Sequence, residues 1–236
     1  MNNETTVLVV DDDKEIAELV EIHLISDGFQ VEKAYSADEG FEILKRKNVN
    51  LIILDIMMPG MDGIKMCEKI RETSAVPIIF LSAKSTDLDK IVGLGSGADD
   101  YVIKPFNPLE LMARVKSQLR RYTELNPSSK LKEKEEDVEI KVTNLIIRKQ
   151  NHEVIAFGEP VNLTPIEFEI IFLLASNAGR VFSTDDIFEH VWKDKMYEAN
   201  NTVMVHIRRI REKIEKGTEN VRIIKTVWGV GYKIDK

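Results

Sequence analysis

The sequence predicts an α/β domain built on a parallel sheet, followed by an α+β domain. Up to about residue 122, short apolar runs alternate with segments of helical periodicity, which is typical of a doubly wound sheet covered on both faces. After a polar stretch without aromatic residues, short runs with turn residues give way to helices and then to a hairpin. We therefore expect one domain at 1–123, a flexible linker at 124–137 and a second domain at 138–236.

The expected strands of the first domain are its short apolar runs, at 6–10, 30–34, 51–54, 76–82 and 100–104. Between the first two runs, the spacing predicts a helix that ends near Gly28. One face of this helix carries Ile16, Leu19, Val20, His23 and Leu24.

The second domain is expected to begin with an antiparallel sheet. Its expected helices lie at 164–177, 183–192 and 201–216, and a hairpin follows at 222–234. The third helix carries a stripe at helical spacing, which predicts a core face: Val203, Ile207, Ile210 and Ile214.

The composition suits a cytoplasmic protein without a membrane contact. Apolar residues make up 43% and charged residues 31% of the chain. No apolar run approaches the roughly 20 residues that cross a bilayer, and the N-terminal segment lacks the pattern of a secretion signal. Cys67, the only cysteine, cannot form a disulfide within the chain and is expected to be a buried structural thiol.

The net charge of −7 is unevenly distributed along the chain. Residues 1–123 carry 15 basic and 21 acidic residues, whereas 138–236 carry 15 and 14. Within the second domain, 200–236 holds 9 basic and 4 acidic residues, a net charge of +5. An acidic half joined to a half with a basic end indicates two functions in one chain.

Several expected strands of the first domain end in chemically active side chains. The first ends at Asp11 and Asp12, the third at Asp55, the fourth at Ser82 and the fifth at Lys104. Since open parallel sheets bind ligands beyond the carboxyl ends of their strands, we expect these side chains to converge. Three neighbouring carboxylates need a hard cation such as Mg²⁺ or Mn²⁺. With the metal bound, Asp55 could act as a nucleophile toward phosphorus.

Each of these residues also has a simpler interpretation. Asp13, or even Asp12, could cap a helix that begins at Lys14, and a strand-end aspartate is common turn chemistry. Lys104 before a proline would ordinarily lie at the surface. The prediction of a site therefore depends on the agreement of all five positions.

The motifs around these residues resemble a known family. They are "VLVVDDD", "LIILDIMMPGMDG", "PIIFLSAK" and "GADDYVIKPF" in the first half, and "NTVMVHIRRIREKI" and "IKTVWGVGYKI" in the second. Together they resemble two-component response regulators of the osmoporin and phosphate-regulon class, and the last stretches look most like vancomycin-resistance regulators. The resemblance covers nearly the whole chain.

This resemblance implies a flavodoxin-like receiver domain of five parallel strands and a winged helix-turn-helix domain. It implies a transcription factor rather than an enzyme. The partners that it implies are a sensor histidine kinase, double-stranded promoter DNA with direct repeats, RNA polymerase and, after phosphorylation, a second copy of the chain.

The resemblance also assigns roles at the strand ends. Asp55 would accept the phosphoryl group. Asp12, Asp55 and the carbonyl of Met57 would bind Mg²⁺, and Asp11 would hold the ion through water. The bond from Lys104 to Pro105 would be cis. The residues that contact the phosphoryl group or switch on its arrival would be Ser82, Ala83, Tyr101 and Lys104.

In relatives, phosphorylated receivers dimerise through their fourth helix, fifth strand and fifth helix. Lys90 with Glu110, and Asp100 with Arg114, stand where relatives form ion pairs between subunits. Each such pair contributes roughly 0 to 1 kcal/mol, so the pairs set register more than affinity. The whole expected surface comprises Lys90, Ile91, Leu94, Asp99, Asp100, Glu110 and Arg114.

The helix at 201–216 is the expected reader of DNA. Arginines beside a small apolar residue suit a major groove, where Arg209 and Val205 would face bases and Arg208 phosphates. A merely solvated face is the simpler alternative. The expected DNA-contacting residues are Thr202, Met204, Val205, His206, Arg208, Arg209, Arg211, Thr226 and Trp228.

The terminal hairpin would form the wing, with Lys225, Thr226 and Trp228 near its tip. Some relatives carry an arginine at the position of Trp228, where it enters the minor groove. Tryptophan cannot supply that charge, so it could instead pack the wing against the recognition helix.

Two other functions fit part of the pattern. A magnesium phosphatase would also use Asp55 as its nucleophile, but haloacid-dehalogenase-like phosphatases need a second aspartate two residues later, where Met57 stands. A binding module with an unphosphorylated acidic pocket, whose second half contacts protein or RNA, would not need the full set of strand-end residues.

Overall fold

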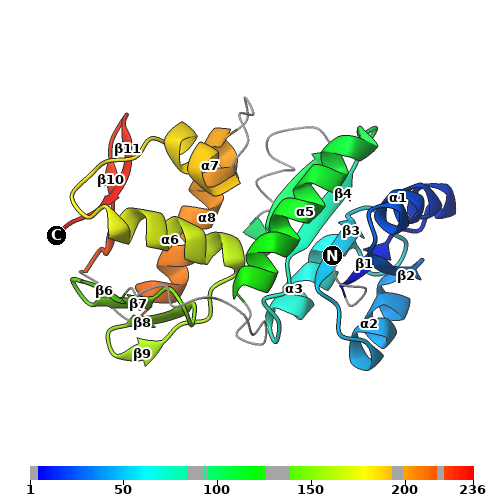
Figure 1. Ribbon diagram of the computed structural model, residues 1–236, viewed down its shortest axis with the longest axis horizontal. Helices are drawn as coiled ribbons and strands as arrows, with labels where there is room; N and C mark the ends of the chain where they lie inside the picture. The colour runs from blue at the N-terminus through cyan, green and yellow to red at the C-terminus, as the bar shows by residue number, and fades with distance from the viewer. Residues whose placement is uncertain (1–4, 84–92, 94, 126–138, 193–198, 217–220) are drawn as a thin grey trace. The chain divides into compact units, whose positions relative to one another are not determined.

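The computed structural model describes residues 5–83, 93, 95–125, 139–192, 199–216 and 221–236 (Figure 1). The chain divides into two compact units, Met1–Tyr122 and Thr123–Lys236. Helix α5 (Pro108–Leu125) extends into the expected linker, so 124–125 are helical. The remainder of that linker lies outside the described residues.

The first unit contains the expected five-stranded parallel sheet, in the order β2-β1-β3-β4-β5. Its strands are β1 (Thr6–Val10), β2 (Gln30–Ala34), β3 (Leu51–Asp55), β4 (Ile78–Ser82) and β5 (Asp100–Ile103). Besides α5, the helices whose bounds the structure describes in this unit are α1 (Lys14–Ser26), α2 (Ala37–Arg46) and α3 (Gly63–Arg71). The chain order reverses between β1 and β3, so the carboxyl ends of these two strands form the switch point of the sheet.

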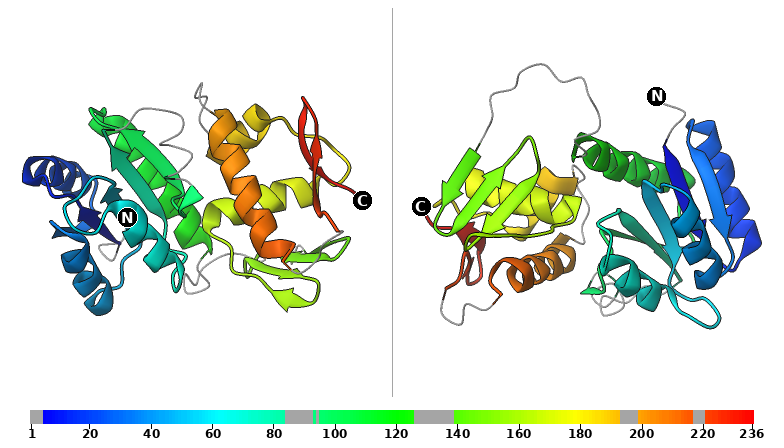
Figure 2. Two further views of the ribbon diagram at one scale, coloured as in Figure 1. Left: turned by 180° about the vertical axis from the view of Figure 1, so that it is seen from behind. Right: turned by 90° about the horizontal axis from the view of Figure 1, so that it is seen from below.

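Helices cover both faces of this sheet (Figures 1 and 2). On one face, alternate strand residues such as Val7 and Val9 share a core cluster with α1 and α5. On the other face, α2 lies so close to α3 that a Cβ on Gly40 would be 2.6 Å from the methyl carbon of Met66. Because both faces are covered, every residue of β1, β3 and β4 is buried. The burial of Cys67 in α3 is also as predicted.

Helix α1 shows a small error in the predicted apolar face. The helix buries Ala17, Val20 and Leu24, whereas Leu19 is 42% exposed. Ala17, Val20 and Leu24 are spaced by three and four residues, so they share one face of the helix, and Leu19 lies beside that face. Asp13 caps the helix, since its carboxylate accepts hydrogen bonds from the next turn, so the simpler interpretation of that residue is correct.

The second unit begins with an antiparallel sheet in the order β6-β7-β8-β9, followed by three helices and a hairpin. The strands of the sheet are β6 (Glu139–Val142), β7 (Leu145–Arg148), β8 (Glu153–Ala156) and β9 (Glu159–Pro160). The helices are α6 (Pro165–Ser176), α7 (Thr184–Trp192) and α8 (Ala199–Ile214), and the hairpin consists of β10 (Ile224–Val227) and β11 (Gly231–Ile234).

The core of the second unit confirms the predicted stripe on α8. All four residues of the stripe, Val203, Ile207, Ile210 and Ile214, are buried, and they share a core cluster with α6, α7 and the hairpin. In the described part of the chain, no helix combines the length and the apolar character that crossing a membrane requires.

Candidate functional site

Three aspartates gather at the switch point of the parallel sheet. Asp11 and Asp12 follow β1 directly, and Asp55 is the last residue of β3. One carboxylate oxygen from each aspartate lies within 4.8 Å of the other two. Asp11 and Asp55 are buried, whereas Asp12 is exposed, so the cluster has a buried floor and one carboxylate at the solvent edge. The predicted convergence of these three side chains is confirmed.

Lys104, which follows β5, reaches the same cluster. Its ammonium nitrogen lies 2.6 Å from Asp11 Oδ2 and 3.2 Å from Asp55 Oδ2. Burial raises the pKa of Asp11, although the hydrogen bond from Lys104 acts in the opposite direction. The peptide bond between Lys104 and Pro105 is cis, as expected.

The donor set of this cluster fits a hard divalent cation. Among the described residues of the cluster, one ammonium accompanies three carboxylates, so their formal charges sum to −2. Carboxylate oxygens are the ligands that Mg²⁺ and Mn²⁺ prefer, and the exposed side at Asp12 leaves room for water. Asp11, Asp12 and Asp55 are therefore the residues that could hold such an ion.

Sequence reasoning missed Gly63, which supports the backbone of Asp55. A Cβ on Gly63 would lie only 2.0 Å from the carbonyl oxygen of Asp55. The Gly63 N–H donates to the carbonyl of Ile56 at 3.0 Å, which ties the start of α3 to the end of β3. A glycine at the first residue of a helix, shortly after a proline turn, was the available signal for this close approach.

The expected switch residues occupy the neighbouring strands. Ser82 is buried at the end of β4, and Ala83 follows it at the surface. Tyr101 is half-buried in β5 and pairs in register with Phe80 of β4. Ser82 therefore ends the strand next to β3, whose last residue is Asp55, and Tyr101 lies one strand further along the sheet.

The expected dimer surface is only partly described, because Lys90, Ile91 and Leu94 lie outside the described residues. The assignment of Asp99 to this surface is wrong. Its carboxylate is fully buried, lies 2.7 Å from the guanidinium of Arg71 and accepts the N–H of Ile78. Successive residues of an extended chain point to opposite faces, which directs Asp99 toward α3 and its neighbour toward α5.

Asp100, Glu110 and Arg114 form a network within one chain. Arg114 donates to both carboxylate oxygens of Asp100 at 3.0 Å and to Glu110 at 3.0 and 3.1 Å. Asp100 and Arg114 are nearly buried, whereas the side chain of Glu110 is 41% exposed. Of these three residues, Glu110 is therefore the most accessible to a second subunit.

The prediction that Arg209 faces outward from α8 is wrong. Arg209 is 8% exposed, and its Nη2 lies 3.1 Å from Oε1 of Glu167, a fully buried residue of α6. Lys213, one turn further along α8, lies 2.6 Å from Oε2 of the same carboxylate. Arg209 stands on the flank of the apolar stripe rather than opposite to it, and α6 supplies a carboxylate on that flank.

The other residues of the expected DNA face on α8 differ in their exposure. Val205 and His206 are buried, and the ring of His206 lies 5.5 Å from that of Trp192, so their expected exposure is also wrong. Thr202 is half-buried. Met204 is exposed, and Arg208, whose side chain is 81% exposed, pairs with Glu212 at 2.8 Å along the helix.

Arg211 connects α8 to the β10–β11 hairpin. Its guanidinium donates to the carbonyl of Ile224 and, at 2.8 Å, to the hydroxyl of Thr226. These contacts occupy two residues that were expected to contact DNA. Trp228 is 91% exposed, so it does not pack the wing against the helix.

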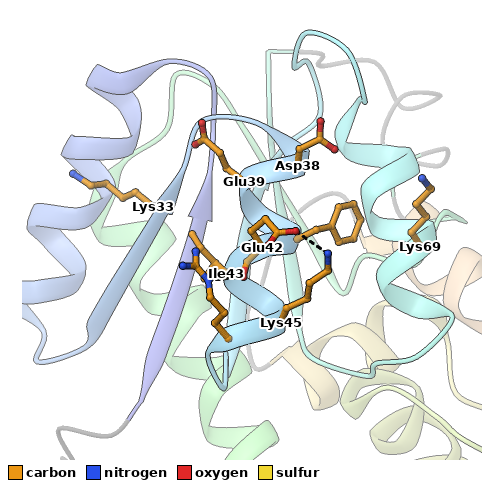
Figure 3. A pocket seen from close by; sticks show the side chains of 9 residues that line it. Lys33, Asp38, Glu39, Glu42, Ile43, Lys45 and Lys69 are labelled. Carbon is orange, nitrogen blue, oxygen red and sulfur yellow. Dashed lines mark hydrogen bonds and ion pairs between the residues drawn. The ribbon is translucent and has the colours of Figure 1, made fainter.

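A separate hollow of about 840 Å³ lies beside α2 (Figure 3). Side chains of both charge signs line it, and in Figure 3 a dashed line joins two of them, Glu42 and Lys45, which lie 2.7 Å apart. None of its lining residues belongs to the acidic cluster. The lining residues are Lys33, Asp38, Glu39, Phe41, Glu42, Ile43, Lys45, Arg46 and Lys69.

Comparisons with known proteins match both units. Residues 7–116 match the family described as "Response regulator receiver domain", and 158–234 match "Transcriptional regulatory protein, C terminal". The chain is 46% identical over 233 residues to the regulatory protein VanRc of Enterococcus gallinarum and 47% identical over 231 residues to VanR of Enterococcus faecium. Each alignment covers 98% of both chains. A solved structure of a RitR mutant, 22% identical, shares the fold with a TM-score of 0.74 over 98% of this chain and 99% of that chain.

Proposed function

Because the chain belongs to the response regulators that join a receiver domain to a DNA-binding transcriptional regulatory domain, we propose that phosphorylation of Asp55 controls its binding to promoter DNA. The observation that carries this proposal is the cluster of three carboxylates with Lys104 at the switch point of the sheet. Of the three carboxylates, only that of Asp55 belongs to the last residue of a strand, β3. Asp11 and Asp12 follow the adjacent strand, β1.

In the proposed reaction, a carboxylate oxygen of Asp55 attacks the phosphorus of a phosphohistidine on a sensor kinase. The O–P bond forms as the P–N bond breaks, and the freed imidazole takes a proton from solvent. The ammonium of Lys104, 3.2 Å from Asp55, and the hydroxyl of Ser82 bind oxygens of the transferred group. A Mg²⁺ ion held by Asp11, Asp12, Asp55 and the carbonyl of Met57 would neutralise the charge that develops there.

The experiment is incubation of the full chain with Mg²⁺ and a small phosphodonor such as acetyl phosphate, followed by intact-mass measurement. We expect one phosphoryl group on the wild type, and none on Asp55→Asn or after chelation of the metal. Asp62→Asn is the matched control, because Asp62 caps α3 outside the cluster and asparagine also caps helices. Equal labelling of Asp55→Asn would contradict the site, and phosphate release far beyond one equivalent would favour a phosphatase.

The partners follow from the same proposal. Phosphorylated receivers would pair through the surface that includes β5 and α5, where Glu110 is accessible, and the second domain would bind direct repeats of promoter DNA and act on RNA polymerase in the cytoplasm. Met204 and Arg208, which are exposed on α8, support an approach of that helix to DNA. Sedimentation with and without phosphodonor tests the pairing: a mass that does not rise on phosphorylation would count against it.

A further inference from the structure

Of the large apolar side chains that the structure describes, Trp228 is the most exposed, at 91%. Val230, two residues later, is 57% exposed, so the tip of the β10–β11 hairpin (red in Figure 1) presents an indole beside a second apolar group. Both side chains stand in the part of the chain that carries the excess of basic residues. An apolar tip on a basic domain fits an anionic partner that also offers apolar surface, and duplex DNA has both in its phosphates and its base stack.

The tip is a tight turn. The N–H of Val230 donates to the carbonyl of Val227 at 2.9 Å, and Gly229 has a φ of +72° at the third position of the turn. A turn of this kind needs a glycine at that position, because other residues rarely adopt a positive φ. Trp228 therefore occupies a corner of the chain with a defined backbone.

Close packing beside the turn holds the hairpin in place. Phe182 and Tyr232 exchange two backbone hydrogen bonds of 2.9 Å, and a Cβ on Gly231 would lie 1.9 Å from the carbonyl oxygen of Phe182. On the other strand, Arg211 of α8 donates to Ile224 and Thr226. The exposed indole is thus carried at a fixed offset from the helix that the proposed function directs to the major groove.

We propose that Trp228 inserts as an apolar wedge into the minor groove next to the major groove that α8 occupies, and that it selects for deformable base steps there. This inference rests on the proposed function. Large apolar side chains that enter the minor groove act by partly unstacking a base step. Pyrimidine–purine steps such as TA and CA unstack most easily, whereas a rigid A-tract with its narrow, electronegative groove favours arginine. An uncharged indole is therefore directed to flexible steps.

Trp228 can be observed directly by fluorescence. The chain has two tryptophans, and the other, Trp192, is 5% exposed and stacked on Phe188 at 4.8 Å. We expect a duplex selected by the phosphorylated full chain to quench or blue-shift the emission of the wild type but not that of Trp228→Ala. Trp228→Ala should bind that duplex ~5- to 100-fold more weakly, the range found when a stacked aromatic is removed. Its unfolding temperature should be unchanged, since the side chain is exposed.

Step selectivity provides a second readout. In duplexes that differ only at the steps flanking the site of α8, the wild type should prefer TA or CA steps over an A-tract. Trp228→Ala should lose this preference, Trp228→Phe should keep it, and Trp228→Arg should reverse it toward the A-tract.

Each outcome has a defined meaning. Wild type that binds DNA with unchanged emission, together with equal affinity and equal step preference in Trp228→Ala, would overturn the wedge and leave the proposed function intact. Wild type that binds no duplex would overturn the proposed function and the wedge together. An emission change caused by self-association or by RNA polymerase without DNA would assign Trp228 to a protein contact, and this too would overturn the wedge.

Discussion

Each unit of the molecule buries a cluster of charges, and the two clusters are balanced in opposite ways. In the described part of the receiver domain, a cluster of three carboxylates contains one ammonium, that of Lys104, which pairs with Asp11 and Asp55. In the DNA-binding domain, the single carboxylate of Glu167 faces two cations, Arg209 and Lys213. A carboxylate with enough internal partners can hold helices together, whereas an excess of carboxylates needs a ligand from outside. This difference agrees with the proposal that the cluster with excess carboxylates is the functional site, whereas the cluster around Glu167 is a structural element.

Each carboxylate oxygen of Glu167 has a cation nearby, and Oε2 accepts hydrogen bonds as well. Oε2 accepts the N–H of Thr164 at 2.8 Å and lies 2.6 Å from Lys213, and Oε1 lies 3.1 Å from Arg209. Burial alone would raise the pKa of Glu167, but the charges of Arg209 and Lys213 hold it below its usual value. The same side chain therefore supports the start of α6 and fixes α8 against it.

The largest effect is expected from removing this carboxylate. Glu167→Ala should lower the free energy of unfolding of the DNA-binding domain by about 3 to 5 kcal/mol, because breaking a buried ion pair leaves the remaining charges without a partner. Glu167→Gln should cost less, since glutamine can still accept from the start of the helix. Urea unfolding followed by tryptophan fluorescence reports on this domain, because both tryptophans, Trp192 and Trp228, belong to it.

Glu159→Gln is the matched control for this measurement. Glu159 is an exposed carboxylate of the same domain, so its substitution should change the stability by less than about 0.5 kcal/mol. A loss in Glu167→Ala no larger than that of the control would break the comparison, because Glu167 would then not hold α6 to α8.

The second prediction concerns the cluster with excess carboxylates. Mg²⁺ should stabilise the receiver domain, by about 2.7 kcal/mol when its concentration is a hundred times the dissociation constant. Asp12→Ala should remove most of this gain, because Asp12 is the carboxylate at the solvent edge of the cluster. Thermal unfolding followed by circular dichroism across a Mg²⁺ titration measures the effect.

Asp13→Ala separates metal binding from helix capping. Asp13 accepts the N–H groups of Glu15 and Ile16, so its loss should cost about 1 kcal/mol at every Mg²⁺ concentration without changing the response to the ion. If Asp12→Ala were stabilised by Mg²⁺ as much as the wild type, the ion would not bind at this cluster. The contrast between the two clusters would then fail.

The same contrast explains what could be predicted from the sequence. Asp11, Asp55 and Lys104 end parallel strands, and strand ends converge wherever such a sheet forms, so local sequence was sufficient to bring them together. The environment of Arg209 depends on where α6 crosses α8, and the periodicity of α8 alone contains no such information. Asp99 was misassigned for a related reason, because its partner Arg71 lies on a different helix.

The pH dependence of stability gives the third prediction. The pKa of Glu167 is lowered in the folded chain, so its contribution is complete above the ordinary value of 4.5 and is lost as the pH falls below it. Between neutral pH and this value, wild type and Glu167→Gln should differ by a constant amount. Below it the difference should shrink, by at most about 1.4 kcal/mol per pH unit for one carboxyl. Parallel stability curves through the acid range would contradict the assigned charge of Glu167.

The smallest effect on stability is expected at Arg208, the exposed counterpart of Arg209 on the same helix. Among the described residues, Arg208 pairs only with Glu212, one turn along α8. Both side chains are mostly exposed, so Arg208→Ala should change the free energy of unfolding by less than about 0.5 kcal/mol. Arg209→Ala should lower the free energy of unfolding by more, because it removes a partner of the buried Glu167.

For DNA binding, the order of the two variants should reverse, with the larger effect in Arg208→Ala. An exposed guanidinium is free to approach phosphates, so Arg208→Ala should weaken binding to a selected site and to scrambled DNA alike and reduce the slope of log affinity against log salt by about 1. Binding of both variants across a salt series decides the matter. If Arg209→Ala instead abolished the discrimination between the two DNAs while its stability stayed at the wild-type value, Arg209 would leave Glu167 to read bases, and the cluster around Glu167 would belong to function as much as to structure.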